Sequence, residues 1–214
     1  MAHELGAIKE AVIKGKHGEI EQLVKALIEN KVDLQEIINE GMIAAMDEVG
    51  RMFSEGEVFV PEMLVSSFTM KKGLDLIKPL IKDEEAESRG TVVMCTVKGD
   101  IHDIGKNLVC MMLEGAGFQV IDLGVDTTVE QLMAKVEETR PHMLGLSALL
   151  TTTMLEMKTV IDTLESRGLR DRVKVMIGGA PVDAAFAKEI KADGYGKDAV
   201  EAVRLARGFT PEKG

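Results

Sequence analysis

The segment VKGDIHDIGKN places His102 between Asp100 and Asp103, with Gly99 and Gly105 on the flanks. A neutral imidazole binds a transition metal through one ring nitrogen, while a carboxylate can accept the proton on the other nitrogen and fix the tautomer. Asp100 and His102 are close enough in sequence for that pairing in a bent loop, and the glycines allow a bulky group to approach closely. The alternative is that Asp103 caps the next helix and that the His-Asp pair is only a local hydrogen bond.

The other histidines do not offer the two or three further donors that a metal held by protein alone would need. His3 and His17 fall in a helical region, and His142 falls at the start of a candidate strand, at the opposite edge of the sheet. A metal at His102 would therefore arrive with its own ligands, in a macrocycle whose axial position the imidazole fills. A macrocycle with a nucleotide tail needs a long slot lined by small residues, and the segments GLSALLTTT, IGGAP and LEGAGF could supply one. The alternatives are a tight turn at the glycine pair and a helix cap at the threonines.

The elements that must position this loop follow residue 90. Short apolar runs predict strands at 91–97, 118–124, 142–148 and 173–179, with a weaker fifth near ADGYG. Helical patterns lie between and after them, near 105–116, 128–139, 153–167, 182–191 and 197–207. This alternation predicts an α/β fold, a flavodoxin-like (Rossmann-like) doubly wound parallel sheet of order 2-1-3-4-5, covered by helices on both faces. In that order, strands 1 and 3 flank the switch point at which ligands bind.

The part of the chain before residue 83 has a helical pattern. Apolar residues recur at three- and four-residue spacing in four segments, at 5–15, 18–31, 33–56 and 61–81. They predict a four-helix bundle, and the charged run KDEEAESRG after it has no apolar periodicity. We therefore expect a helical cap domain at 1–82, a linker at 83–90 and an α/β domain at 91–214.

Composition restricts the class of protein. The 214 residues carry a formal net charge of −10, which argues against binding to nucleic acid or to an anionic membrane surface. We find no run of 18 apolar residues and no leader-like N-terminus, so we expect a cytoplasmic protein. Cys95 and Cys110 lie in apolar segments, which predicts buried, reduced thiols.

Three motifs at fixed intervals carry a resemblance to a known family. They are Asp-x-His-x-x-Gly as DIHDIG, then after 41 residues Ser-x-Leu as SAL, then after 28 residues Gly-Gly. Together they resemble the cobalamin-binding signature of corrinoid proteins in anaerobic methyltransferase systems, and VKGDIHDIGKN also resembles the cobalamin-binding region of methionine synthase. The helical segment with GRMFSEGEVFVPEM resembles the helical cap of that family.

The resemblance implies a role for individual residues. His102 would be the lower axial ligand of cobalt in place of the cofactor's dimethylbenzimidazole, Asp100 would accept from the other imidazole nitrogen, and Thr153 would continue that relay. Phe59 would shield the upper face of the cobalt, with Phe53, Met63 and Met70 as weaker candidates. The implied cofactor-binding residues are Gly99, Asp100, His102, Asp103, Ile104, Gly105, Ser147, Leu149, Thr151, Gly178, Gly179 and Phe59.

The resemblance also implies a function that needs partners. Unlike methionine synthase, the chain has no substrate barrels, so it resembles the stand-alone methyl carriers rather than a complete enzyme. Such a carrier would accept a methyl group on Co(I) from a substrate-specific methyltransferase, with a methylamine, methanol, a betaine or an aryl methyl ether as donor. It would pass the group from methyl-Co(III) to an acceptor methyltransferase that uses tetrahydrofolate or coenzyme M, and a reductive activator would restore the cobalt. The alternatives are the cobalamin-binding subunit of an adenosylcobalamin mutase, a cobalamin-sensing module, and a flavodoxin-like module for another ligand.

Overall fold

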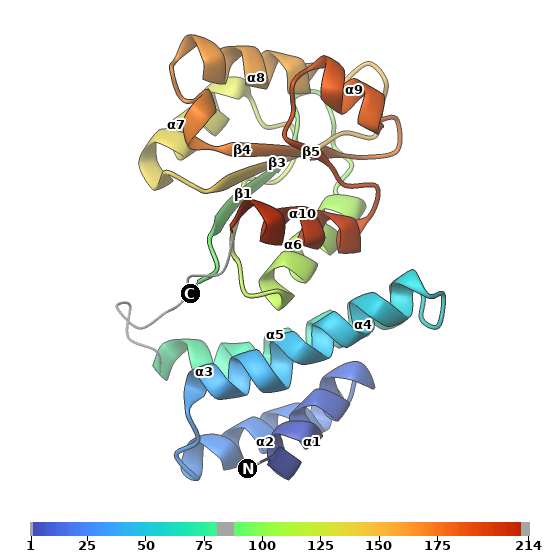
Figure 1. Ribbon diagram of the computed structural model, residues 1–214, viewed down its shortest axis with the longest axis vertical. Helices are drawn as coiled ribbons and strands as arrows, with labels where there is room; N and C mark the ends of the chain where they lie inside the picture. The colour runs from blue at the N-terminus through green and yellow to red at the C-terminus, as the bar shows by residue number, and fades with distance from the viewer. Residues whose placement is uncertain (1, 81–87, 211–214) are drawn as a thin grey trace. The chain divides into compact units, whose positions relative to one another are not determined.

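The computed structural model describes residues 2–80 and 88–210 and divides into two compact units (Figure 1). The helical unit is the part before residue 88 together with 115–117, and the α/β unit is the remainder. Most of the predicted linker, 83–87, lies outside the described residues, so the predicted domain boundaries remain a prediction.

The helical unit is built from four amphipathic segments, as the sequence predicts. They are α1 (Ala2–Ile13), α2 (His17–Glu29), a continuous stretch of α3 (Leu34–Glu36), a π-helix (Ile37–Ile43) and α4 (Ala44–Ser54), and α5 (Val60–Ile77) with a 3-10 turn (Lys78–Leu80). Apolar periodicity predicts the third helix but does not distinguish its π-helical part. The core of the unit includes Ile8, Ile20, Ile37, Met42, Met63 and Met70, all less than 2% exposed.

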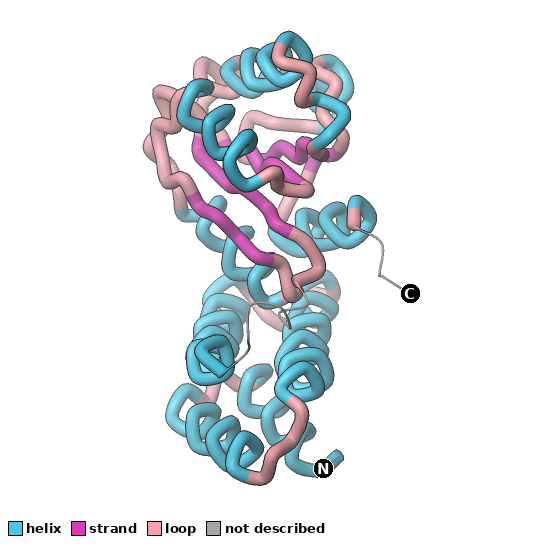
Figure 2. The backbone as a smooth tube through the Cα atoms, turned by 90° about the vertical axis from the view of Figure 1, so that its left-hand side faces the viewer, coloured by secondary structure: helices cyan, strands magenta, loops and turns pink. Residues whose placement is uncertain are grey.

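The α/β unit contains one parallel sheet of five strands in the order β2-β1-β3-β4-β5, which confirms the predicted topology. The strands are β1 (Thr91–Thr96), β2 (Gln119–Asp122), β3 (Met143–Ser147), β4 (Lys174–Gly178) and β5 (Gly194–Tyr195). β1 pairs with β2 on one side and with β3 on the other. The sheet therefore has its switch point between β1 and β3, and Figure 2 shows it as one layer between helices.

Helices cover both faces of this sheet. α6 (Ile104–Gly115) and α10 (Ala199–Phe209) lie on one face, and α7 (Val129–Thr139), α8 (Glu156–Ser166) and α9 (Ala184–Glu189) lie on the other (Figure 1). A continuous apolar core joins the second face to its helices through residues such as Leu144, Leu132, Met157 and Phe186. The predicted boundaries differ from the observed ones by a few residues. In particular, α8 begins at Glu156 rather than near 153, because residues 149–155 form bends and turns at the end of β3.

Candidate functional site

The loop after β1 is held in place by hydrogen bonds to its own backbone and to the loop after β2. Gly99 has a φ of +79°, a left-handed conformation that favours glycine, and its N–H donates to Asp126 Oδ1 at 2.7 Å. The N–H of Asp126 donates in turn to the carbonyl of Asp100 at 2.9 Å, and the N–H of Asp100 donates to the carbonyl of Val97 at 3.1 Å. The backbone beside His102 is therefore fixed from two elements.

The carboxylate of Asp100 is the centre of the site. The residue is 1% exposed and accepts hydrogen bonds from five donors. Oδ1 accepts from His102 Nδ1 at 2.8 Å and from the His102 N–H at 3.0 Å. Oδ2 accepts from Thr153 Oγ1 at 2.6 Å and from the N–H groups of Leu149 at 2.7 Å and Leu150 at 3.3 Å. The DIHDIG loop and the turn after β3 thus meet on one carboxylate.

These bonds set the charge of Asp100 and the tautomer of a neutral His102. Burial opposes ionisation of Asp100, but hydrogen bonds from the Thr153 hydroxyl, the Leu149 N–H and His102 hold the pKa of that carboxyl well below its usual range. An ionised carboxylate only accepts, so a neutral imidazole at His102 must carry its proton on Nδ1. The lone pair is then on Nε2, and the side chain is 46% exposed. This arrangement is that of an oriented metal ligand.

The turn after β3 and the end of β4 form the rest of the switch-point edge. Ser147 pairs with Gly178 in the register of β3 and β4. A Cβ on Gly179 would lie 1.8 Å from the carbonyl oxygen of Ala148, and one on Gly178 would lie 2.9 Å from the carbonyl oxygen of Gly196. Packing of the chain against itself therefore requires glycine at both positions, and their part in a nucleotide slot remains a prediction.

The structure brings some predicted residues together and places others apart. Asp100, His102, Leu149 and Thr153 are in direct contact. Thr153 does not cap α8, whose N-cap residue is Leu155, so the helix-cap alternative is wrong for it. The remaining predicted residues of the α/β unit lie near the carboxyl ends of β1, β3 and β4: Gly99, Asp103, Ile104, Gly105, Ser147, Thr151, Gly178 and Gly179.

The alternative role for Asp103 was that of a helix cap. Its carbonyl accepts from the N–H of Asn107 at 2.7 Å, and its Oδ2 accepts from Asn107 Nδ2 at 3.0 Å. The backbone and the side chain of Asp103 are therefore both hydrogen-bonded to Asn107, in the first turns of α6.

The aromatic and methionine candidates lie in the helical unit. Phe59 is 66% exposed, Phe53 is half-buried, and Met63 and Met70 are buried in the core of that unit. Burial of the two methionines agrees with their treatment as weaker candidates, because a methionine at helical spacing usually fills a core.

Sequence reasoning missed several apolar side chains that the loops expose. Ile101 is 74% exposed, Leu155 is 59%, Leu150 is 42% and Val125 is 38% exposed, and the predicted residue Ile104 reaches 85% at the start of α6. Exposed apolar side chains near a polar centre commonly mark a ligand-binding surface. The sequence gives no signal of their exposure, because an apolar residue beside a strand is equally compatible with a core position.

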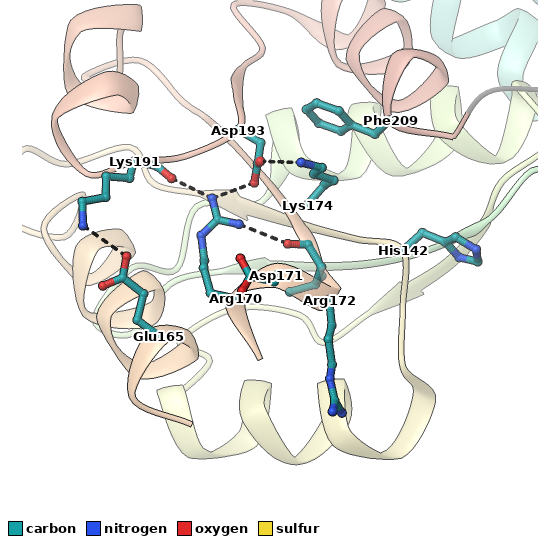
Figure 3. Close-up of a pocket in the computed structure, with 10 residues that line it drawn as sticks. His142, Glu165, Arg170, Asp171, Arg172, Lys174, Lys191, Asp193 and Phe209 are labelled. Carbon is teal, nitrogen blue, oxygen red and sulfur yellow. Dashed lines mark hydrogen bonds and ion pairs between the residues drawn. The ribbon is translucent and has the colours of Figure 1, made fainter. Parts of the chain in front are cut away.

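A hollow lies at the amino ends of β3 and β4, at the edge of the sheet opposite the His102 loop. It has a volume of about 510 Å³ and a charged lining. Figure 3 shows Arg170 directed at Asp193 and at the carbonyl of Lys191, at 2.8 and 2.7 Å, while Lys174 reaches Asp193 at 3.0 Å. Lys191 also pairs with Glu165 at 3.3 Å. These groups satisfy one another and tie the start of β4 to the segment before β5, which is a stabilising role.

Three further observations concern the residues that the structure describes. No group of three or more His, Cys, Asp or Glu side chains there is arranged to hold a metal ion. Within residues 2–80 and 88–210, no helix combines the length and the apolar character needed to cross a membrane. Cys95 and Cys110 are free and buried, as predicted.

Comparison with known proteins agrees with the geometry of the loop. Residues 90–204 match a family described as B12 binding domain, and residues 5–78 match a second family of the same description. The chain is 40% identical over 205 residues to a corrinoid protein of Desulfitobacterium hafniense (strain Y51), which covers 94% of this chain and 95% of the relative. It is 44% identical over 178 residues to dimethylamine corrinoid protein 1 of Methanosarcina acetivorans, covering 83% of this chain and 84% of that protein.

A chain in a solved cobalamin methyltransferase complex is also similar to this chain. The crystal structure of the methanol:cobalamin methyltransferase complex MtaBC from Methanosarcina barkeri contains a chain that superposes with a TM-score of 0.88. That match is 32% identical and covers 97% of this chain and 80% of the other. With a cobalamin-type motif in the loop after β1, an oriented imidazole and relatives along almost its whole length, this chain belongs to the family of corrinoid proteins with B12-binding domains.

Proposed function

We propose that this protein is a methyl carrier, which holds a corrinoid through His102 and presents it to two methyltransferases in turn. The observation that supports this most directly is the pairing of His102 Nδ1 with the buried carboxylate of Asp100 at 2.8 Å. That pairing leaves the lone pair on Nε2 of a half-exposed ring. The bound corrinoid would supply a cobalt centre that takes up and releases a methyl group.

The residues around His102 suit such a cofactor. A corrin ring has a broad apolar surface, and Ile101 and Ile104 expose apolar side chains on either side of the ligand in sequence. Leu149, Leu150 and Leu155 add further exposed apolar area on the turn after β3. We infer that these side chains contact the ring, while Ser147, Gly178 and Gly179 face the nucleotide tail.

Asp100 and Thr153 would act through His102 and not on the methyl group itself. Asp100 holds the proton on Nδ1, and the Thr153 hydroxyl donates to Asp100 at 2.6 Å. An imidazole that is not bound to a metal could take a proton on Nε2, and the negative charge on Asp100 would stabilise the resulting imidazolium. The three residues would therefore link metal binding by His102 to the proton on Nε2.

The names of the relatives indicate the kind of partner that this chain would have. One relative is named a dimethylamine corrinoid protein, and one solved relative is in a methanol:cobalamin methyltransferase complex. We propose that the donor of this chain is a small methylated compound of that kind, such as a methylamine, methanol, a betaine or an aryl methyl ether. A dedicated methyltransferase would load the group, a second would move it to tetrahydrofolate or coenzyme M, and a reductive activator would restore the cofactor.

Phe59 is the candidate for shielding the upper face of the cofactor. It is 66% exposed in the helical unit, so its ring is accessible to a ligand. We expect the methyl–cobalt bond to be photolysed faster in methyl-loaded Phe59→Ala than in the methyl-loaded wild type. The matched control is Phe68→Ala, because Phe68 is 50% exposed in the same unit. Equal photolysis rates in Phe59→Ala and the wild type would contradict shielding by this residue.

Electron paramagnetic resonance of the Co(II) form tests the axial ligand. The protein is loaded with cobalamin whose benzimidazole carries ¹⁵N. Coupling of cobalt to ¹⁴N shows that a protein nitrogen is the ligand, and loss of that coupling in His102→Ala assigns it. Coupling to ¹⁵N would show that the cofactor keeps its own base and would overturn the assignment of His102.

The carrier role needs a separate test. The reduced, cobalamin-loaded protein is incubated with a donor methyltransferase and a ¹³C-labelled methyl donor, then separated and mixed with an acceptor methyltransferase. We expect the label on the separated protein first and on the acceptor afterwards. Label that never resides on the protein for any donor of the proposed class would contradict the carrier role.

A further inference from the structure

Lys106 is a buried cation in the first turn of α6, four residues after His102. The residue is 2% exposed, and its side chain is 1% exposed. Burial of an ammonium group is unfavourable unless the group is paired and hydrogen-bonded. Lys106 Nζ donates to Asn107 Oδ1 at 2.8 Å and forms an ion pair with Asp122 at the end of β2. The proposed axial ligation does not account for a lysine at this position.

The Asn107 amide connects this ammonium to the residue next to His102. An ammonium only donates, so the Asn107 oxygen must face Lys106 and its NH₂ must face the other way. There Nδ2 donates to Asp103 Oδ2 at 3.0 Å, and the backbone N–H of Asn107 donates to the Asp103 carbonyl at 2.7 Å. Asp122, Lys106, Asn107 and Asp103 thus form a continuous polar row that ends beside the proposed ligand.

A second path leads from the same ion pair to the backbone of His102. Asp122 Oδ1 accepts from the Gly124 N–H at 2.9 Å, and the Gly124 carbonyl accepts from the Thr96 N–H at 2.9 Å. The hydroxyl of Thr96 then donates to the carbonyl of His102 at 3.0 Å. The carbonyl of His102 is therefore held by Thr96, and the carbonyl and side chain of the next residue, Asp103, are held by Asn107. Both supports trace back to Lys106 and Asp122.

We propose that Lys106 is a positioning residue for axial ligation: its buried ammonium, through Asn107 and Asp122, holds the His102–Asp103 backbone so that the imidazole is presented to cobalt. This inference rests on the proposed role of His102 as the axial ligand. Asp100 fixes the tautomer of the ring, whereas the polar row fixes the backbone from which the ring extends. The alternative is that Lys106 only attaches α6 to β2, in which case its loss would change stability but not ligation.

The expected effect is a change in the ratio of axially bound to axially free imidazole. Loss of a residue that supports a metal ligand typically changes metal affinity by about 10- to 100-fold. Because the polar row acts one step further from the metal, we expect about a tenfold fall in that ratio, the lower end of the range. A displaced backbone moves the ring without changing its protonation, so the fall should occur at constant pH.

The test uses the full chain loaded with cobalamin and reduced to the Co(II) form. Lys106→Met removes the ammonium but keeps a long apolar stem, and Asp122 can be hydrated because its side chain is 36% exposed. The matched control is Lys158→Met, which removes an exposed lysine paired with Asp162 at 2.6 Å on α8. Nitrogen coupling in the electron paramagnetic resonance spectrum and the visible absorption give the bound fraction at pH 7.

A second variant keeps the proposal testable if Lys106→Met does not fold. Asn107→Ala breaks the polar row between Lys106 and Asp103 but leaves the ion pair with Asp122, and alanine is the best helix former. We expect a reduced bound fraction in Lys106→Met and Asn107→Ala and the wild-type fraction in Lys158→Met. Wild-type fractions in the folded variants would overturn the positioning role alone. Coupling to the cofactor's own benzimidazole in the wild type would instead overturn the axial role of His102.

Discussion

Replacement of Asp100 by asparagine should reverse the tautomer of His102. The carboxylate accepts at both oxygens, whereas an amide has one accepting oxygen and one donating NH₂. An amide oxygen at the Oδ2 position keeps the three donors from Leu149, Leu150 and Thr153. The NH₂ then faces His102, whose Nδ1 can accept from it only when the ring proton is on Nε2. A protonated Nε2 has no lone pair for cobalt.

The magnitude follows from the bonds that change. If the amide in Asp100→Asn were turned the other way, its NH₂ would face the three donors from Leu149, Leu150 and Thr153. The orientation with the amide oxygen toward these donors is therefore favoured. In it, the His102 N–H at 3.0 Å faces another donor, which costs about 1.5–3 kcal/mol of folding free energy as a lost bond to a charged group. Loss of the orienting partner should weaken axial ligation by about 10- to 100-fold, or about 1.4–2.7 kcal/mol.

The assay is the fraction of Co(II) with an axial protein nitrogen, measured by electron paramagnetic resonance at pH 7 in the loaded protein. Asp162→Asn is the control, because Asp162 is an exposed carboxylate on α8. We expect the fraction to fall in Asp100→Asn and to stay at the wild-type value in Asp162→Asn. A wild-type fraction in Asp100→Asn would refute the argument from the tautomer.

Three further predictions concern the protein without its cofactor. Thr153→Val removes the hydroxyl that donates to Asp100 at 2.6 Å, so we expect a loss of about 1.5–3 kcal/mol in the free energy of unfolding by urea at pH 7. No loss would mean that this bond does not stabilise the turn. Burial opposes ionisation of Asp193, but hydrogen bonds and ion pairs from Val175, Lys174 and Arg170 lower its pKa. The ionised carboxylate therefore stabilises the fold at pH values above the ordinary carboxyl pKa of about 4, and this stabilisation is lost as the pH falls toward the lowered pKa of the folded protein. Asp193→Asn should therefore be less stable than the wild type at pH 7 by more than at pH 3, and equal deficits would contradict the assignment. Burial raises the pKa of the Cys95 and Cys110 thiols to about 12, so both should resist iodoacetamide at pH 8 unless urea is added, and stability should fall as pH rises above about 8.5. Mass spectrometry of the adducts checks this, and modification of the native protein at the rate of the unfolded chain would count against it.

Much of the fold could be predicted because it depends on local patterns. The alternation of apolar runs and helical segments after residue 90 predicts all five strands and their order, and the structure confirms both. The predicted start of α8 was three residues too early, because polar groups of the segment 149–155 donate hydrogen bonds to Asp100 instead of continuing a helix. Apolar periodicity cannot detect that competition.

The candidate site was predicted in part for the same reason. Asp100 and His102 are two residues apart, so their contact at 2.8 Å could be expected from spacing in a bent loop. The ion pair of Lys106 with Asp122 could not be expected, because Asp122 lies 16 residues further along the chain, at the end of β2. The N–H groups of Leu149 and Leu150 were also missed as partners of Asp100, since a backbone donor carries no signal in the residue type.

The sequence by itself therefore determined the order of the elements, the place of the His-Asp motif at the end of β1 and the family. Only the tertiary structure decided the state of that motif. Burial of Asp100, its bond from Thr153 53 residues away and the enclosure of Lys106 all depend on which strands lie side by side. Electrostatic effects on a buried charge are set by the groups within a few ångströms of it, and those groups come from segments that are distant in the chain.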